Sequence, residues 1–326
     1  MRRISSTPRP GWQQTVRGQG VSDSRWDESA CYALDLPEVL KLEEVTEELY
    51  RMCLAAAQYV VSHDRYADFG VPAWAAPAIE QSMRMGTPSL VARLDLWYDG
   101  TSQPKLLGCQ ADRPDCLVET AIAQWYWLEA TRPDQDQWNS LHERLVASWR
   151  RIGGLLPGSM VHFGWSHDPG GTEEWTAGYL ADAAEQAGIK SRLIPMHEIG
   201  WDGSRFVDDA GVPIDTCFKR YPWEWMLQEP YGRLATTPDS PTVWIEPLWR
   251  MLLSNGALFD VLWQLYPDHP NLLSAPIPPP SLGGRPVVLG SWVVTGDDGA
   301  GLPAGAGMRE QGADGSLKFV PHYVAR

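Results

Sequence analysis

Charged residues that could take part in chemistry lie on a strand-like segment in the first third of the chain. In Val91–Tyr98 the residue types alternate with a period of two, which places Arg93, Asp95 and Trp97 on one face. A guanidinium and a carboxylate thus share a face with an aromatic ring. An Asp-Gly turn signal follows, and residues 105–110 are predicted to return as the hairpin partner.

Two further carboxylates, Glu173 and Glu174, stand at the start of a predicted helix, Thr172–Ala187. Thr172 is the predicted N-cap, and Gly188 is expected to end the helix. Negative charge near a helix N-terminus stabilises the helix by itself. Ligand binding and charge compensation therefore both stay open for this pair.

The elements that must position these residues alternate between helices and strands. A long amphipathic helix is predicted over 36–61, because apolar residues recur at steps of three and four. The middle third resembles a βαβ unit, with strands at 160–163 and 192–194 on either side of the Thr172–Ala187 helix. Further helices are expected at 116–130, 134–152 and 249–266, the last interrupted at 254–256.

Composition excludes several classes of function. The chain of 326 residues has 41 acidic and 27 basic residues, a net charge of -14, which repels a phosphate backbone and argues against nucleic-acid binding. No apolar run approaches the length of a membrane helix. The five cysteines form no CxxC pair, so reduced, mostly buried thiols in a cytoplasmic protein are expected.

Several landmarks together are similar to the glutathionylspermidine synthase family, ATP-grasp-type ligases that join a peptide carboxylate to an amine. The landmarks run over nearly the whole chain: Trp26–Ala30, Arg93–Asp95, the Thr172–Gly188 helix, Phe218–Trp225, Ile245–Trp249, Leu253–Asn255, Gly290–Val294, Gly307–Arg309 and Phe319–His322. Any one of these strings alone is weak evidence.

The resemblance implies a set of site residues. Arg93 and Arg309 match catalytic basic residues, and Asp95 matches a metal ligand. Glu173, Glu174 and Glu224 match positions that bind the peptide or amine, and for Glu224, which lies between two tryptophans, a site role is favoured over a structural one. ATP and magnesium are the implied cofactors, and a small peptide or amine is the implied ligand.

Three departures from the family pattern all affect the ATP and metal half. Gly108 stands where the family has a glutamate and Gln110 where it has an asparagine, with Asp112 as a possible replacement ligand. Gly256 stands where the family has a lysine that faces the nucleotide. Residues 274–286 form a proline-rich bridge where the family carries the nucleotide clamp.

The resemblance implies an α/β (α+β) fold: an ATP-grasp-like frame with an inserted pre-ATP-grasp-like βαβ lobe and a truncated C-terminal nucleotide clamp. The expected divisions are 1–155, the N-terminal part of the core with the Arg93/Asp95 strand; 156–243, the substrate lobe; and 244–326, the C-terminal part of the core, shortened at 274–286.

Three hypotheses for function follow. The first is a divergent, catalytically impaired ligase relative that acts as a binding or regulatory protein. The second is an active ATP-grasp carboxylate–amine ligase with altered metal and nucleotide ligands. The third is a subunit that pairs with a protein partner or with a second copy of itself, because a missing clamp exposes apolar surface.

Overall fold

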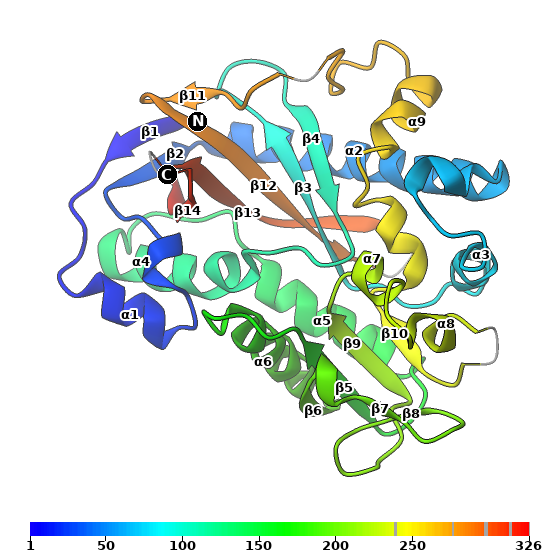
Figure 1. Ribbon diagram of the computed structural model, residues 1–326. Helices are drawn as coiled ribbons and strands as arrows, with labels where there is room; N and C mark the ends of the chain where they lie inside the picture. The colour runs from blue at the N-terminus through cyan, green and yellow to red at the C-terminus, as the bar shows by residue number, and fades with distance from the viewer. Residues whose placement is uncertain (238–239, 276, 297–298, 313–314, 326) are drawn as a thin grey trace.

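The two largest sheets form the body of the protein in the computed structural model, which describes residues 1–237, 240–275, 277–296, 299–312 and 315–325 (Figure 1). A smaller sheet has the strand order β1-β2-β15. The strands are β1 Arg2–Ser5, β2 Ala30–Leu34, β3 Val91–Trp97, β4 Lys105–Gln110, β5 Met160–Trp165, β6 Lys190–Pro195, β7 Gly200–Trp201, β8 Phe206–Val207, β9 Thr216–Arg220, β10 Val243–Ile245, β11 Ser281–Leu282, β12 Arg285–Thr295, β13 Gly301–Gln311, β14 Leu317–Val320 and β15 His322–Val324. The helices are α1 Trp12–Gly18, α2 Leu36–Ser62, α3 Ala76–Arg84, α4 Gln124–Thr131, α5 Leu141–Gly153, α6 Thr172–Gln186, α7 Trp223–Met226, α8 Gly232–Ala235 and α9 Leu258–Leu265.

The first sheet is antiparallel, in the order β14-β13-β12-β3-β4, with β11 paired to β12. The predicted hairpin of β3 and β4 is confirmed, and its register sets Asp95 opposite Gly108. On the other side of β3, Asp95 pairs with Gly290 of β12. A Cβ at Gly290 would lie 2.8 Å from Cδ of Arg93, so glycine leaves the room that this arginine side chain occupies.

The predicted long helix is confirmed as α2, which contacts β12 and β13 of the first sheet. Asp35 and Glu38 form a capping box at its start. The Thr46 hydroxyl of α2 lies 2.7 Å from that of Ser291 on β12, which pairs two buried polar groups. The helix therefore supports the sheet at β12 and β13, next to the strand that carries Arg93 and Asp95.

The second sheet is parallel, in the order β10-β9-β5-β6, and confirms the predicted βαβ unit. The prediction that Thr172 caps α6 is wrong. The cap position is Gly171, and the carboxylate of Asp168 accepts hydrogen bonds from the amides of Thr172 (3.0 Å) and Glu173 (2.9 Å). An acidic side chain reaching forward from the preceding loop replaces the expected hydroxyl, and Gly188 follows the helix with a φ of 87° as expected.

The helix expected over 134–152 begins only at Leu141. The preceding segment instead bonds to neighbouring strands: the Trp138 carbonyl accepts from Ala306 on β13, and the Trp138 amide donates to Nε2 of His322 on β15. The helix expected near 116–130 opens with a π-helical turn, Glu119–Ala123, before α4. The predicted break at 254–256 is confirmed, between a 3-10 helix, Leu248–Leu252, and α9.

Buried charges join the two sheets. Glu246, just after β10, is fully buried, and its Oε1 accepts hydrogen bonds from the Leu90 and Val91 amides at 2.9 Å. Arg250 lies 3.3 Å from the same carboxylate and donates to the Val91 carbonyl at 2.7 Å. Because a buried charge without a partner is strongly unfavourable, this pair fixes the end of β10 against the start of β3.

No helix in the described ranges is long and apolar enough to cross a membrane. All five cysteines are free and buried, as the sequence predicts.

We expect His322 to make stability depend on pH. Its complete burial lowers the pKa of the imidazole to about 4, whereas an unfolded histidine has a pKa of about 6.5. Between these values the unfolded chain binds a proton that the folded chain does not, so stability falls as pH falls, by about 3 kcal/mol in total. Urea unfolding at pH 7 and pH 4 should show a smaller pH-dependent loss for His322→Gln. The His197→Gln control, whose side chain is 69% exposed, should match the wild type, and equal losses in all three proteins would contradict the expectation.

Candidate functional site

The structure brings three of the sequence-predicted site residues together on one face of the antiparallel sheet. Arg93 Nε lies 2.7 Å from Asp95 Oδ1, and Arg93 Nη2 lies 3.2 Å from Oδ2. Arg309 on β13 reaches across β12 and places Nη2 2.5 Å from Asp95 Oδ1. Burial alone raises the pKa of Asp95, but the charges of the two guanidinium groups outweigh it and hold that pKa below its usual value.

Three residues that the sequence reasoning missed complete this cluster. Arg93 also pairs with Asp115, and Arg25 lies 3.6 Å from Asp115 and 3.4 Å from Glu119. Three guanidinium groups thus face three carboxylates, and their formal charges balance. The signal that points to Asp115 is its place in the loop after β4, the strand paired with that of Arg93. Nothing in the spacing of Arg25 or Glu119 indicates their part.

The residues around Asp95 do not fit a magnesium site. Magnesium prefers several oxygen ligands in octahedral geometry, whereas both oxygens of Asp95 accept from guanidinium groups and Gly108 opposite it has no side chain. Asp112 does not replace the missing ligand, because its oxygens bind Lys219 Nζ (2.5 Å) and the Trp223 amide (2.6 Å). The described residues contain no group of three His, Cys, Asp or Glu that could hold a metal ion.

A cavity of about 420 Å³ lies beside this cluster, between the end of β4, α7 and the turn after the 3-10 helix 248–252. Its polar lining includes Gln110, Glu224 and Ser254. Ser254 Oγ accepts from the amides of residues 111 and 112, so its own proton is free to be donated. Glu224 forms no ion pair with another described residue, and it therefore supplies an uncompensated negative charge.

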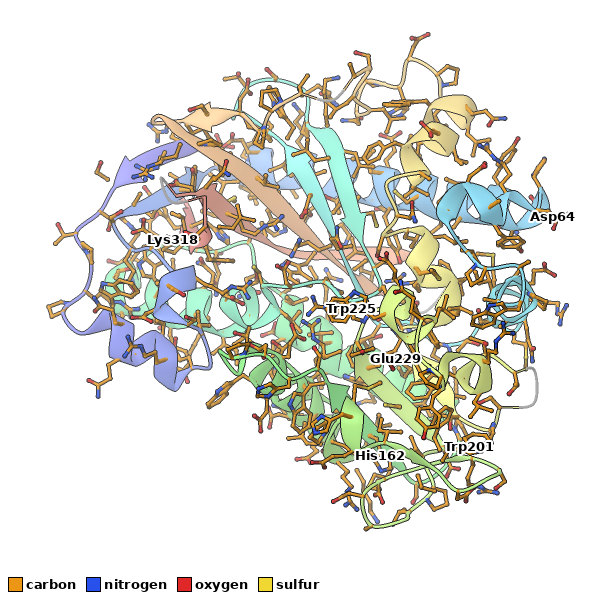
Figure 2. The ribbon with its side chains drawn as sticks, in the orientation of Figure 1. Asp64, His162, Trp201, Trp225, Glu229 and Lys318 are labelled. Atoms are coloured by element: carbon orange, nitrogen blue, oxygen red, sulfur yellow. The ribbon has the colours of Figure 1, made fainter. Side chains whose placement is uncertain are left out.

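Trp225 of α7 lies near Arg113, a residue that lines this cavity. Figure 2 shows Trp225 there, where the ends of β3 and β4 approach the parallel sheet. The Arg113 guanidinium lies 6.0 Å from the centre of the Trp225 ring, and the Tyr221 hydroxyl donates to Glu229. Arg113 itself lines the cavity, and its contacts with Glu173 and with the Trp225 ring hold it there.

The other two predicted substrate carboxylates are separated from the cavity. Glu173 is buried, pairs with Arg220 at 3.0 Å and also pairs with Arg113. Glu174, the next residue, is exposed and lines a different hollow of the surface. Of the three predicted substrate-binding residues, only Glu224 lines the cavity next to Gln110.

The loop 111–116 ties the ion cluster to the parallel sheet. Within it, Asp112 binds Lys219 of β9, and the Pro114 carbonyl accepts from Arg220 Nη1 at 2.6 Å. The next residue, Asp115, contacts Arg93 on β3. One short loop therefore fixes charges of both sheets at the same time.

The proline-rich bridge passes the outer end of β3. The Trp97 indole nitrogen donates to the Pro278 carbonyl at 3.1 Å, and the Pro280 carbonyl accepts from the Val287 amide at 2.9 Å. The following short strand, β11, pairs with the start of β12. The prolines thus act only as acceptors here, and the ladder of the sheet resumes after them.

Comparisons with known proteins identify the family of the chain. The family model described as "Glutathionylspermidine synthase preATP-grasp" matches residues 3–282. A putative acid–amine ligase from Haemophilus influenzae is 34% identical over 320 residues, covering 93% of this chain and 80% of that protein. Trypanothione synthetase from Crithidia fasciculata is 26% identical over 293 residues, covering 79% of this chain but only 43% of that protein.

The fold is also similar to a solved structure, a glutathione synthetase-like effector from Globodera pallida. The two share a TM-score of 0.54 and 11% identity, over 99% of this chain and 98% of the effector. This likeness concerns the fold alone, and it confirms the predicted mixed α/β class.

We expect Asp95→Asn to destabilise the protein by about 3 kcal/mol, because it removes the carboxylate that two largely buried guanidinium groups share and leaves them only the more exposed Asp115. Chemical denaturation without added ligand measures the change. The control Asp209→Asn removes a carboxylate that is 54% exposed and should shift stability by about 0.5 kcal/mol or less. If Asp95→Asn leaves stability unchanged or raises it, Asp95 is instead a ligand-binding carboxylate whose presence lowers the stability of the free protein.

Proposed function

Because the chain belongs to the glutathionylspermidine synthase family, we propose that it binds a small amine in the cavity beside Glu224 and no longer joins it to a carboxylate with ATP. It acts as a binding or regulatory protein, and the five free, buried cysteines suit the cytoplasm. The observation that carries the proposal is the pairing of Asp95 with Gly108, with both oxygens of Asp95 taken by guanidinium groups.

The argument against nucleotide chemistry rests on charge. ATP needs a divalent ion and basic side chains that remain available to its phosphates. In this cluster three carboxylates already neutralise Arg25, Arg93 and Arg309, so the guanidinium groups offer a phosphate little uncompensated charge. Gly256 supplies no cation either, and the bridge 274–286 is too short to form a clamp. The part of the Haemophilus influenzae relative that this chain does not match, a fifth of its length, is compatible with such a loss.

The argument for an amine rests on the cavity. Asp112 is neutralised by Lys219, and Arg113 shares the Glu173 carboxylate with Arg220. Glu224 is the charged lining residue that forms no ion pair in the described part of the chain. An ammonium group paired with Glu224 would find further acceptors in the amide oxygens of Gln110 and Gln228. A volume of about 420 Å³ suits a small molecule.

A second candidate is an active ligase with altered metal and nucleotide ligands. It is favoured by the convergence of Arg93, Asp95 and Arg309 on one face, the set that the family pattern implies. Incubation with ATP and a panel of thiols, peptides and amines tests it. Substrate-dependent release of ADP supports this candidate, and a flat response across the panel removes it.

We expect isothermal titration to give no binding of ATP with magnesium tighter than about 1 mM for the wild type. Gly108→Glu adds a carboxylate opposite Asp95, at a position where a Cβ meets no atom within 4 Å. This variant should bind magnesium-ATP at least about tenfold more tightly, a gain of about 1.4 kcal/mol. Gly154→Glu is the matched control, because it adds the same charge at another open position and should change nothing. Micromolar, magnesium-dependent binding to the wild type would contradict the proposal.

We expect Glu224→Gln to weaken binding of primary amines by roughly ten- to one-hundredfold, because a charge-assisted hydrogen bond is worth about 1.5–3 kcal/mol. Titration of a series from ethylamine to spermidine into wild type and variant measures the change. Glu198→Gln removes an exposed carboxylate outside the cavity and serves as the control. Equal weakening in both variants would point to general attraction by the acidic surface and not to the cavity.

A further inference from the structure

Two neighbouring hollows of about 640 and 270 Å³ are lined by residues of α4, α6 and the ends of nearby helices. Figure 1 shows the positions of α1, α4 and α6. The two hollows share Ile122 and Tyr126 in their lining. Trp125 belongs to the smaller hollow, and Trp175 and Leu193 to the larger. We call these five residues the aromatic groove. None of these five residues belongs to the ion cluster or lines the cavity beside Glu224.

The apolar side chains of the aromatic groove are unusually exposed. Trp125, Tyr126, Trp175 and Leu193 are 45%, 48%, 53% and 42% exposed. A group of large apolar side chains that remains this accessible, across helices and a strand far apart in the sequence, is typical of a protein interface. A small ligand is a poorer occupant, because such sites usually enclose 70–90% or more of the ligand surface.

The rings are held in place before any partner binds. A Cβ at Gly20 would lie 2.7 Å from the indole of Trp175, so the absence of a side chain there lets this ring pack against the backbone after α1. The rings of Trp125 and Tyr126 meet edge to face at 4.8 Å. Fixed aromatic side chains lose little conformational entropy on binding, which favours their use as anchors.

The charge around the aromatic groove is of one sign. Its two hollows are lined by three carboxylates, Glu143, Glu174 and Asp182, and by no lysine or arginine among the described residues. None of these three carboxylates forms an ion pair in the described part of the chain. Arg9, which donates to the Tyr126 carbonyl, pairs with Glu28, and Arg17, next to the lining residue Gly18, pairs with Asp23. The groove therefore offers uncompensated negative charge beside exposed rings.

From this combination we propose that the aromatic groove docks a partner protein through a segment that carries lysine or arginine beside aromatic or aliphatic side chains. Basic groups of the segment pair with Glu143, Glu174 and Asp182 and make cation–π contacts with the exposed rings. Apolar groups of the segment cover Trp175 and Tyr126. A second copy of this chain is a poor occupant, because a symmetric contact would set these carboxylates against their own copies. The proposal does not depend on the function assigned to the cavity.

A displayed library of random peptides, selected on the full-length protein, tests the proposal. Enriched peptides should combine basic with aromatic or aliphatic residues, and the synthetic peptides should bind by fluorescence anisotropy. Glu174→Gln/Asp182→Asn and Trp175→Ala should each weaken this binding at least about tenfold. Tyr231→Ala, which removes a ring of comparable exposure (46%) elsewhere, should leave it within about twofold. The charge variant guards against a misfolded Trp175→Ala, and circular dichroism with thermal unfolding compares all variants.

Several outcomes would overturn the proposal. Enrichment of acidic or neutral peptides contradicts the charge argument, and binding that survives both groove variants places the contact elsewhere. Light scattering that shows a dimer lost on Trp175→Ala assigns the surface to a second copy. Saturable binding of a small organic cation such as tetramethylammonium, lost in the same variants while no peptide is enriched, assigns it to a small molecule.

Discussion

Buried ion pairs fix how the two sheets of this protein meet. Lys219 is fully buried on β9 and finds its counter-charge in Asp112, just after β4. Arg220, the next residue, is held by Glu173 at the start of α6. Separating the sheets would leave such charges buried and unpaired or expose them at the cost of surrounding apolar packing. These ion pairs therefore hold the loop 111–116 in place, and the loop in turn forms a rigid wall of the cavity.

The same constraint explains the state of the ion cluster. The loop that delivers Asp112 to Lys219 also carries Asp115 to Arg93. A carboxylate placed there neutralises a guanidinium group that would otherwise be available to an anionic ligand. With Gly108 opposite Asp95, no second carboxylate on β4 competes for the arginines or recruits a metal. The charges of the cluster thus neutralise one another. Its internal ion pairs supply the counter-charges that a bound ligand would otherwise supply.

Regular elements and local alternation were predictable from the sequence, whereas contacts made by loops were not. The period of two in β3 and the amphipathic period of α2 reflect burial, which the sequence records directly. The family landmarks brought Arg93, Asp95 and Arg309 into one candidate site, and the sheet register explains their proximity. The part of Asp168 as the cap of α6 and that of Asp115 in the cluster depend on loop paths. No periodicity encodes such paths, so Asp168 could not be identified beforehand, and only the place of Asp115 in the loop after β4 pointed to the cluster.

Glu173 and Glu174 show how strongly helix geometry divides neighbouring residues. Successive residues on an α-helix point about 100° apart, and in the first turn of α6 this rotation gives the two adjacent glutamates different surroundings. One turns inward to Arg220 and the other outward to the aromatic groove. The family resemblance assigns substrate binding to both glutamates, but Glu173 is buried and Glu174 is exposed. Glu173 links the two sheets through Arg220 and Arg113, and Glu174 adds negative charge beside the exposed rings of the aromatic groove.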